Sequence, residues 1–210
     1  DSPALSCCER GAYLLPILAI PLVYFTREPE RAENTPLCEL DGLCIGGVNN
    51  SAIKTVAKTL LSRCGAAQTE RFLAHANVSD MPIGAYNQVR MGAQKTALVP
   101  SLYALRADEK QTFLRVPQEG PVLIPSHLAA RTSIARDLAQ KLAARILCRK
   151  LCDFYAQNGD LILFPACAET HSRQEGPRYF VPRTDWLNSC DPQAFEDFYA
   201  AHLPGARKLF

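Results

Sequence analysis

The sequence has few of the features that identify a protein class at once. It contains 1 tryptophan and 2 methionines, and it has no long low-complexity tract, no internal repeat and no block of like charges. The absence of biased segments argues against extended disorder. A net charge of +2 is too small to indicate a class of partner, so only the distribution of charge along the chain can do so.

Long hydrophobic runs are also lacking. The most apolar stretch, residues 12–25, is interrupted by Pro16 and Pro21, and it is shorter than the roughly 20 residues that a spanning helix needs. No small-residue cleavage site follows it, as a signal peptide requires. We therefore expect a strand with proline irregularities here and no membrane span.

The composition is that of an ordinary globular protein. Of 210 residues, 48% are hydrophobic and 21% are charged, which is enough to build a substantial core. We expect a single globular domain over 1–210, with a strand-rich part at 1–48 and a helical or mixed part at 49–210. Because strands and helices are mixed without a regular βαβ rhythm, the sequence favours the α+β class, with mixed or antiparallel strands and about four helices.

Four segments carry helix signals, and one carries a hairpin signal. The helices are expected at 49–65, 66–77, 132–157 and 190–205. In the first, Asn50 or Ser51 is a good cap and Gly65 a stop; in the last, Asp191 is the cap. Asp41-Gly42 predicts a two-residue hairpin turn, which would place Cys38 and Cys44 on opposite faces and keep them from pairing.

Nine cysteines are a high and odd number for this length. Cys148 and Cys152 are four residues apart on a predicted helix, so both thiols can reach one ion, and Cys167-x3-His171 follows the next predicted strand. Four such nitrogen and sulfur ligands predict a tetrahedral zinc site. The spacing is not that of a CxxC knuckle, so burial of these thiols in the core is the alternative, with no cofactor at all.

The same residues suggest a second chemistry. Cys148 lies close to arginines that would lower its thiol pKa, and His171 is a candidate base for Cys167 or Cys148. A cysteine- or metal-dependent enzyme centred on Cys148, Cys152, Cys167 and His171 is therefore an alternative function, and whether the protein is an enzyme stays open.

The charge distribution is more suggestive than the net charge. The segment 131–150 is strongly basic, whereas 151–203 is acidic. A basic helix of this kind fits an acidic protein surface or a nucleic acid, although the two segments can also neutralise each other within the fold. The expected partner-binding residues are Arg136, Lys141, Arg145, Arg149 and Lys150.

A glycine-rich turn before the first predicted helix is a candidate anion site. Gly46 and Gly47 would let backbone N–H groups cradle an anion, and Lys54 lies one turn into the helix. The sequence does not match a phosphate-binding loop, so a capped helix after a flexible turn explains it equally well.

Three functions follow from these observations. The first is a non-catalytic module, intracellular and in a reducing compartment, that docks a protein or nucleic-acid partner through the basic helix 131–150, with a structural metal as added support. The second is the enzyme described above. The third is a secreted, disulfide-bonded glycoprotein, for which Asn49 and Asn77 stand in glycosylation sequons.

Overall fold

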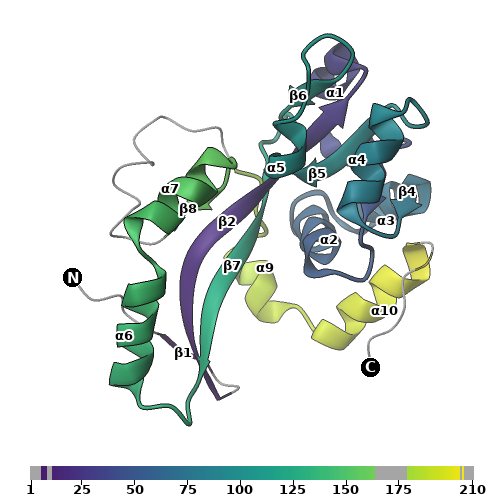
Figure 1. Cartoon of the computed structure of the whole chain (residues 1–210). Coiled ribbons are helices and arrows are strands. Elements are labelled where there is room, and N and C mark those ends of the chain that lie inside the picture. The colour runs from purple at the N-terminus through teal and green to yellow at the C-terminus, as the bar shows by residue number, and fades with distance from the viewer. Residues whose placement is uncertain (1–5, 9–10, 164–178, 204, 206–210) are drawn as a thin grey trace. The chain divides into compact units, whose positions relative to one another are not determined.

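The chain folds into two compact units. The structure is a computed structural model that describes residues 6–8, 11–163, 179–203 and 205 (Figure 1). Unit 1 comprises residues 1–21 and 125–176, and unit 2 comprises residues 22–124 and 177–210. Two of the three passages of the chain between the units lie inside long strands, β2 (Ala12–Thr26) and β7 (Val122–Arg131).

Unit 2 is built on a mixed sheet. The strands β3 (Cys44–Gly46), β4 (Asn77–Ser79) and β5 (Thr96–Pro100) run parallel, with β3 in the middle. The end of β2 pairs antiparallel with β5 and with β6 (Phe113–Arg115). Residues 44–100 thus form two consecutive βαβ crossovers, and the carboxyl ends of the parallel strands meet at one edge.

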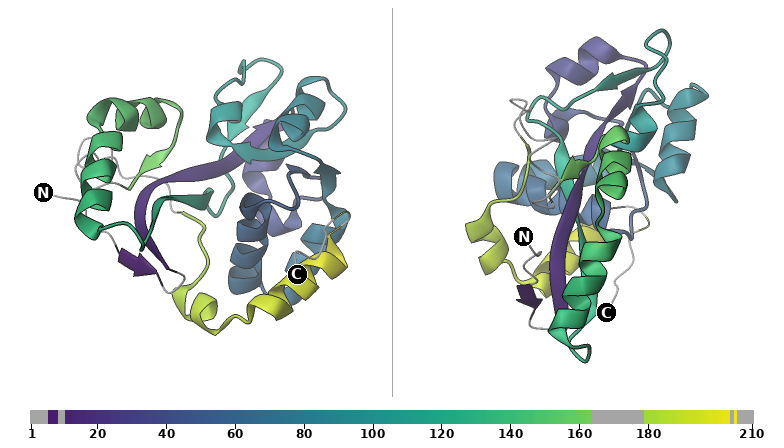
Figure 2. Two further views of the ribbon diagram at one scale, coloured as in Figure 1. Left: turned by 60° about the horizontal axis from the view of Figure 1, so that its bottom comes forward. Right: turned by 60° about the vertical axis from the view of Figure 1, so that its left-hand side comes forward.

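Most of the described helices belong to unit 2. They are α1 (Pro29–Asn34), the 3-10 helix η1 (Leu37–Glu39), α2 (Ser51–Cys64), α3 (Ala66–His75), α4 (Pro82–Arg90), α5 (Ser101–Ala104), α9 (Thr184–Ser189) and α10 (Pro192–His202). The helix α10, drawn in yellow, packs against α2 and α3 (Figure 2).

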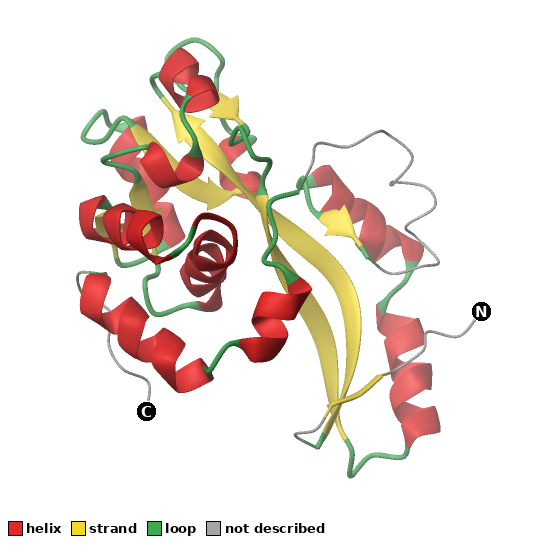
Figure 3. Ribbon diagram, turned by 180° about the vertical axis from the view of Figure 1, so that it is seen from behind, coloured by secondary structure: helices red, strands yellow, loops and turns green. Residues whose placement is uncertain are grey.

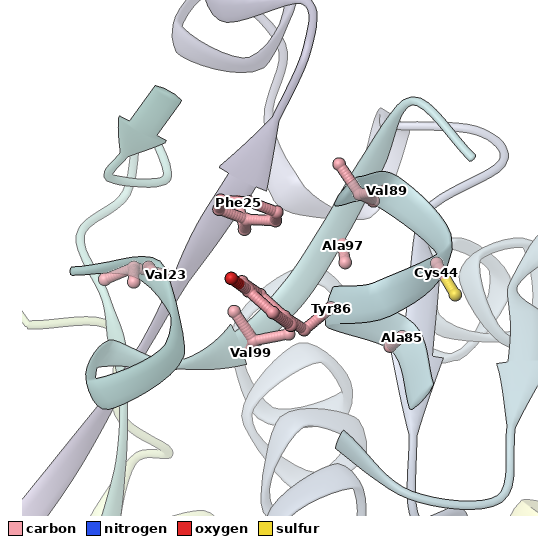
Figure 4. Close-up of a cluster of buried hydrophobic side chains, with 9 residues drawn as sticks. Val23, Phe25, Cys44, Ala85, Tyr86, Val89, Ala97 and Val99 are labelled. Atoms are coloured by element: carbon pink, nitrogen blue, oxygen red, sulfur yellow. The ribbon is translucent and has the colours of Figure 1, made fainter. Parts of the chain in front are cut away.

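One face of the unit 2 sheet is covered by α4. Phe25, Tyr86 and Val99 belong to a buried apolar cluster between β2, β5 and this helix (Figure 4). The rings of Phe25 and Tyr86 contact each other in a tilted arrangement, with their centroids 4.6 Å apart and their planes at 35°. Since side chains alternate along a strand, the equally buried Tyr24 and Leu98 face the other side, so this sheet is apolar on both faces.

Unit 1 is smaller and antiparallel. β1 (Ser6–Cys8), the first part of β2, the later part of β7 and β8 (Leu161–Ile162) pair here. The helices α6 (Arg136–Ile146) and α7 (Arg149–Gln157) lie along these strands (Figure 3). The core of unit 1 consists of Leu15, Leu18, Ala139, Ala143, Leu147, Cys152 and Ile162.

The predicted fold class is confirmed. The protein is α+β with a mixed sheet, and 12–25 is the proline-containing strand β2. The described residues form nine α-helices rather than about four: the single helix expected over 132–157 is two helices, α6 and α7, and α1, α4, α5 and α9 lie outside the expected segments. No helix in the described ranges is long and apolar enough to cross a membrane.

Two local predictions are wrong. Residues 37–39 form a 3-10 turn and Cys44 begins a parallel strand, so no hairpin forms around Asp41-Gly42. The helix expected over 132–157 is broken at Leu147 and Cys148, whose backbones are not helical. In its first half the large apolar residues Leu138 and Leu142 are about half exposed, because the small side chains of Ala139 and Ala143 are the ones that contact the strands.

Candidate functional site

A hollow of about 530 Å³ lies at the carboxyl ends of β3 and β4 in unit 2. We call it the α2–α4 hollow, because its wall is formed by the turns that lead into these two helices. It is lined by Gly47, Val48, Asn49, Asn50, Val78, Asp80, Met81, Pro82 and Gly205. In open α/β sheets this edge, outside the carboxyl ends of parallel strands, is where ligands bind.

The first wall is the capped start of α2. The side-chain oxygen of Asn50 accepts hydrogen bonds from the N–H groups of Ala52 (3.0 Å) and Ile53 (3.4 Å). Gly47 has φ +73°, in the left-handed region, and its N–H donates to the Ser79 carbonyl (3.0 Å). A side chain on Gly47 would collide with the Asn50 side chain, so glycine is required for this tight turn.

The second wall is the start of α4, which begins with Pro82 at its first position. The Met81–Pro82 backbone passes so close to Gly46 that a side chain on Gly46 would collide with it. Both glycines of the predicted anion motif therefore allow the turns after β3 and β4 to approach each other. The result is that the N-termini of α2 and α4 open into one hollow.

These two helix starts give the hollow a positive electrostatic character. The first N–H groups of each helix precede any intrahelical acceptor, and each helix carries about half a positive charge at its N-terminus. Ala52 and Ile53 are bonded by the Asn50 cap, and the N–H groups of Gly84 and Ala85 donate to the Met81 carbonyl, so the remaining N–H groups at the two helix starts are those of Ser51 and Ile83. The exposed carboxylate of Asp80 brings a negative charge to the hollow and is the one acidic side chain among the lining residues.

The helix α10 supports the hollow from behind. The buried Tyr199 hydroxyl donates to the Val48 carbonyl (2.5 Å), which fixes the turn after β3. The Lys54 Nζ lies 2.5 Å from the Glu196 carboxylate, and the two side chains are only 11% and 16% exposed. The positive charge of Lys54 is thus matched by Glu196, and Lys54 does not line the hollow.

Comparisons with known proteins identify the fold. No family model and no curated protein matches the sequence. Among solved structures, a protein titled as a two-component system protein of signal transduction matches 89% of this chain with a TM-score of 0.64 and 14% identity. Iron-bound HitA from Pseudomonas aeruginosa matches 86% (TM-score 0.57, 17% identity), and the sulfate-binding protein SubI from Mycobacterium tuberculosis matches 85% (TM-score 0.55, 15% identity).

The resemblance at these identities is one of fold. The chain spans 69% of the signal-transduction protein, 60% of HitA and 69% of SubI. The titles of the latter two name a small inorganic ligand, iron or sulfate.

The function predicted first from the sequence is therefore wrong. The fold is shared with proteins that bind small solutes, which overturns the module that docks a protein or a nucleic acid through residues 131–150. The intracellular location expected with that module is not supported either. The predicted partner-binding residues Arg136, Lys141, Arg145, Arg149 and Lys150 all lie on exposed positions of α6 and α7 in unit 1.

The predicted zinc protein is not supported. Within the residues that the structure describes, no three His, Cys, Asp or Glu side chains are grouped to hold a metal. Cys152 is buried in the unit 1 core, whereas Cys148 is exposed at the N-cap of α7. The other two predicted ligands, Cys167 and His171, lie outside the described residues.

A second hollow, of about 830 Å³, lies beside α7 in unit 1 and is lined in part by Cys148, Arg149 and Phe154. It contains one end of the predicted basic surface, but Arg149 is already 3.8 Å from Asp153. It is larger than the α2–α4 hollow, but of the helices that the structure describes only α7 begins beside it.

Sequence reasoning missed half of the α2–α4 hollow. It singled out Gly46 and Gly47 but not Asp80, Pro82 or Tyr199. A signal was present in "SDMPIG": an acidic residue followed by proline at a helix start. No local sequence signal indicated a role for Tyr199, because its hydroxyl bonds the Val48 carbonyl, which is 151 residues away in the sequence.

Proposed function

We propose that this chain is a solute-binding protein that holds a small solute with an anionic oxygen group in the α2–α4 hollow. One observation carries the proposal: the N-termini of α2 and α4 converge at the carboxyl ends of two parallel strands. Helix starts of this kind bind carboxylate, sulfate or phosphate through backbone N–H groups and the helix dipole. The fold that the chain shares with a sulfate-binding protein supports the same assignment.

The ligand class is narrowed by Asp80. A purely anionic solute would be repelled by this carboxylate, whereas a zwitterion can place its anionic group at the helix starts and its cationic group at Asp80. We therefore expect a zwitterion to bind more tightly than an inorganic anion. Substitution of Asp80 by Asn should weaken the zwitterion and strengthen the simple anion.

The fold also bears on location. HitA and SubI belong to a set of matches that includes a periplasmic thiamin binding protein. We propose that this chain works outside the cytoplasm. This agrees with the secreted protein that the sequence analysis gave as its third alternative.

The proposal is tested by isothermal titration calorimetry with three probes: inorganic sulfate, inorganic phosphate and glycine. The informative variant is Ser51→Pro. Proline is favoured at the first helical position, and Asn50 before it is already extended (φ −93°, ψ 167°), so the helix should form while one N–H is lost.

The matched control is Ser51→Ala, which removes the hydroxyl but keeps the N–H. A hydrogen bond to a charged group is worth about 1.5–3 kcal/mol, so Ser51→Pro should weaken binding roughly 10- to 100-fold and Ser51→Ala hardly at all. Equal affinities for both variants, or no binding of any probe to the wild type, would remove the α2–α4 hollow as the site.

A further inference from the structure

A smaller pocket, of about 210 Å³, lies in unit 2 where α4 ends, and we call it the Arg90 pocket. The α2–α4 hollow is at the carboxyl ends of the parallel strands, whereas this pocket lies beside Phe25, which pairs with Ala97 near the amino end of β5. The two sites share no lining residue, so they are separate. The Arg90 pocket is lined by Phe25, Tyr86, Arg90, Arg106, Asp108, Gln111 and Thr112.

The inner wall of the pocket is aromatic. The Tyr86 side chain extends from α4 past the ring of Phe25 (Figure 4). On its other side the centroid of the Tyr86 ring lies 5.9 Å from that of Tyr103 in α5, and the Arg106 guanidinium lies 5.7 Å from the Tyr103 centroid. This series of contacts places the ends of α4 and α5 around one pocket.

The hydroxyl of Tyr86 lacks a partner. Tyr86 is only 6% exposed, yet no residue that the structure describes forms a hydrogen bond with its hydroxyl. The hydroxyl is not sealed inside the protein, so it reaches the space of the pocket that Tyr86 lines. Because a buried hydroxyl without a hydrogen bond is costly, a polar group bound in the pocket would stabilise it.

Two arginines of the pocket are also unpaired. Neither Arg90 nor Arg106 makes an ion pair or a side-chain hydrogen bond with any residue in the described ranges. The guanidinium groups that lack a partner in unit 2 are therefore the two that line this pocket. The other described arginines of unit 2 each have a carboxylate or carbonyl partner: Arg27, Arg31, Arg63, Arg71, Arg115 and Arg183.

The Asp108 carboxylate does not neutralise these arginines. One of its oxygens accepts hydrogen bonds from the N–H groups of Lys110 (3.0 Å), Gln111 (2.9 Å) and Thr112 (2.9 Å). Its negative charge is thus stabilised within its own turn. Two arginines and one aspartate leave the lining side chains with a net charge of +1, so the pocket favours an anion.

We infer that the Arg90 pocket binds a short dicarboxylate, with Arg90 and Arg106 each holding one carboxylate and the Tyr86 hydroxyl donating to one of them. A guanidinium is a planar fork of donors that matches a carboxylate. Because one arginine ends α4 and the other follows α5, the pair favours a ligand with two carboxylates over an anion with a single centre. The inference does not rest on the proposed function, since it concerns other residues.

The test is a ¹⁵N NMR titration of the wild-type protein near neutral pH with malonate, which has two carboxylates, and with acetate, which has one. Malonate should cause saturable shifts at the amides of residues 86–90 and 106–112. It should bind at least about 10-fold more tightly than acetate, because it gains a second charge-assisted contact. Glycine, a probe for the α2–α4 hollow, should instead shift residues 47–52 and 80–84, so the failure of one site is seen separately from the failure of the other.

Two variants test the side chains, and one provides the control. Arg106→Gln should weaken malonate binding about 10-fold. Lys110→Gln removes the same charge from an exposed residue of the same turn that does not line the pocket, and should bind malonate as the wild type does. Tyr86→Phe should weaken binding about 3-fold and leave the urea midpoint unchanged, because its hydroxyl bonds no described residue.

Two results would overturn the inference. One is a wild-type titration in which malonate causes no saturable shift at residues 86–90 and 106–112. The other is an equal loss of malonate affinity in Arg106→Gln and Lys110→Gln, which would indicate general charge attraction rather than a site. The first result is read from the wild type alone, so a variant that fails to fold does not obscure it.

Discussion

Lys54 and Glu196 offer the sharpest test of how unit 2 is held together. Their charged atoms are 2.5 Å apart, and both side chains are mostly buried. Substitution of Lys54 by Met keeps the aliphatic stem but leaves the Glu196 carboxylate without its partner. Breaking a buried ion pair costs about 3–5 kcal/mol. Because Glu196 keeps some contact with water, we expect the lower end, about 3 kcal/mol.

The measurement is urea unfolding of the wild type, Lys54→Met, and the double variant Lys54→Met/Glu196→Gln. With a slope of about 2 kcal/mol per M, the single variant should lower the midpoint by about 1.5 M. The double variant should recover most of this loss, because no unpaired charge stays buried.

Lys58→Met is the matched control, one turn further along α2. Its Nζ lies 4.8 Å from the Phe195 ring centroid in a half-exposed position, so its loss should cost less than about 1 kcal/mol. If Lys54→Met is no more destabilising than Lys58→Met, the ion pair does not join α10 to α2 as the structure implies. The double variant also tests Lys54 as a ligand residue: it should bind the calorimetric probes as the wild type does.

Two further predictions concern a buried hydroxyl and a partly buried carboxyl. Tyr199→Phe removes the hydrogen bond to the Val48 carbonyl and should cost about 1–2 kcal/mol in urea unfolding; no loss would mean that α10 does not fix this turn. Burial raises the pKa of Asp160 to about 6, above its unfolded value of about 3.9, so the native state binds the extra proton and stability falls as pH rises from about 4 to 6. Asp160→Asn should remove this pH dependence and, after allowance for solvent screening, raise the free energy of unfolding at pH 7 by about 1 kcal/mol. Unfolding measured from about pH 4 to pH 7 checks this, and an unchanged dependence of stability on pH would contradict it.

The parts of the fold that could be predicted are those with complete local signals. For α2 the sequence has a cap at Asn50, an apolar stripe and a glycine stop, and the structure begins the helix at Ser51 and ends it at Cys64. α10 is similar, with Asp191 as its cap through a bond to the Gln193 N–H. In both helices the local preference and the tertiary packing agree.

The parts that failed depend on packing between distant segments. α4 has a proline and a glycine in its first turn and only a short apolar stripe, and it is stabilised by contact of Ala85, Tyr86 and Val89 with the sheet. In α6 the large apolar residues are exposed and two alanines are buried. Hydrophobic periodicity alone does not predict which of these apolar residues face the core. The candidate site was half predicted for the same reason: the Gly46-Gly47 turn is a local signal, whereas its approach to Met81 and Pro82 is not.

A small solute is expected to bind at the converging starts of α2 and α4. The most direct measurement is a ¹⁵N NMR titration of the wild-type protein with glycine, inorganic phosphate and inorganic sulfate, followed at each backbone amide. The largest shifts are expected at residues 47–52 and 80–84, with Ser51 and Ile83 among the strongest. Saturable shifts that leave these amides unchanged and appear elsewhere would contradict it.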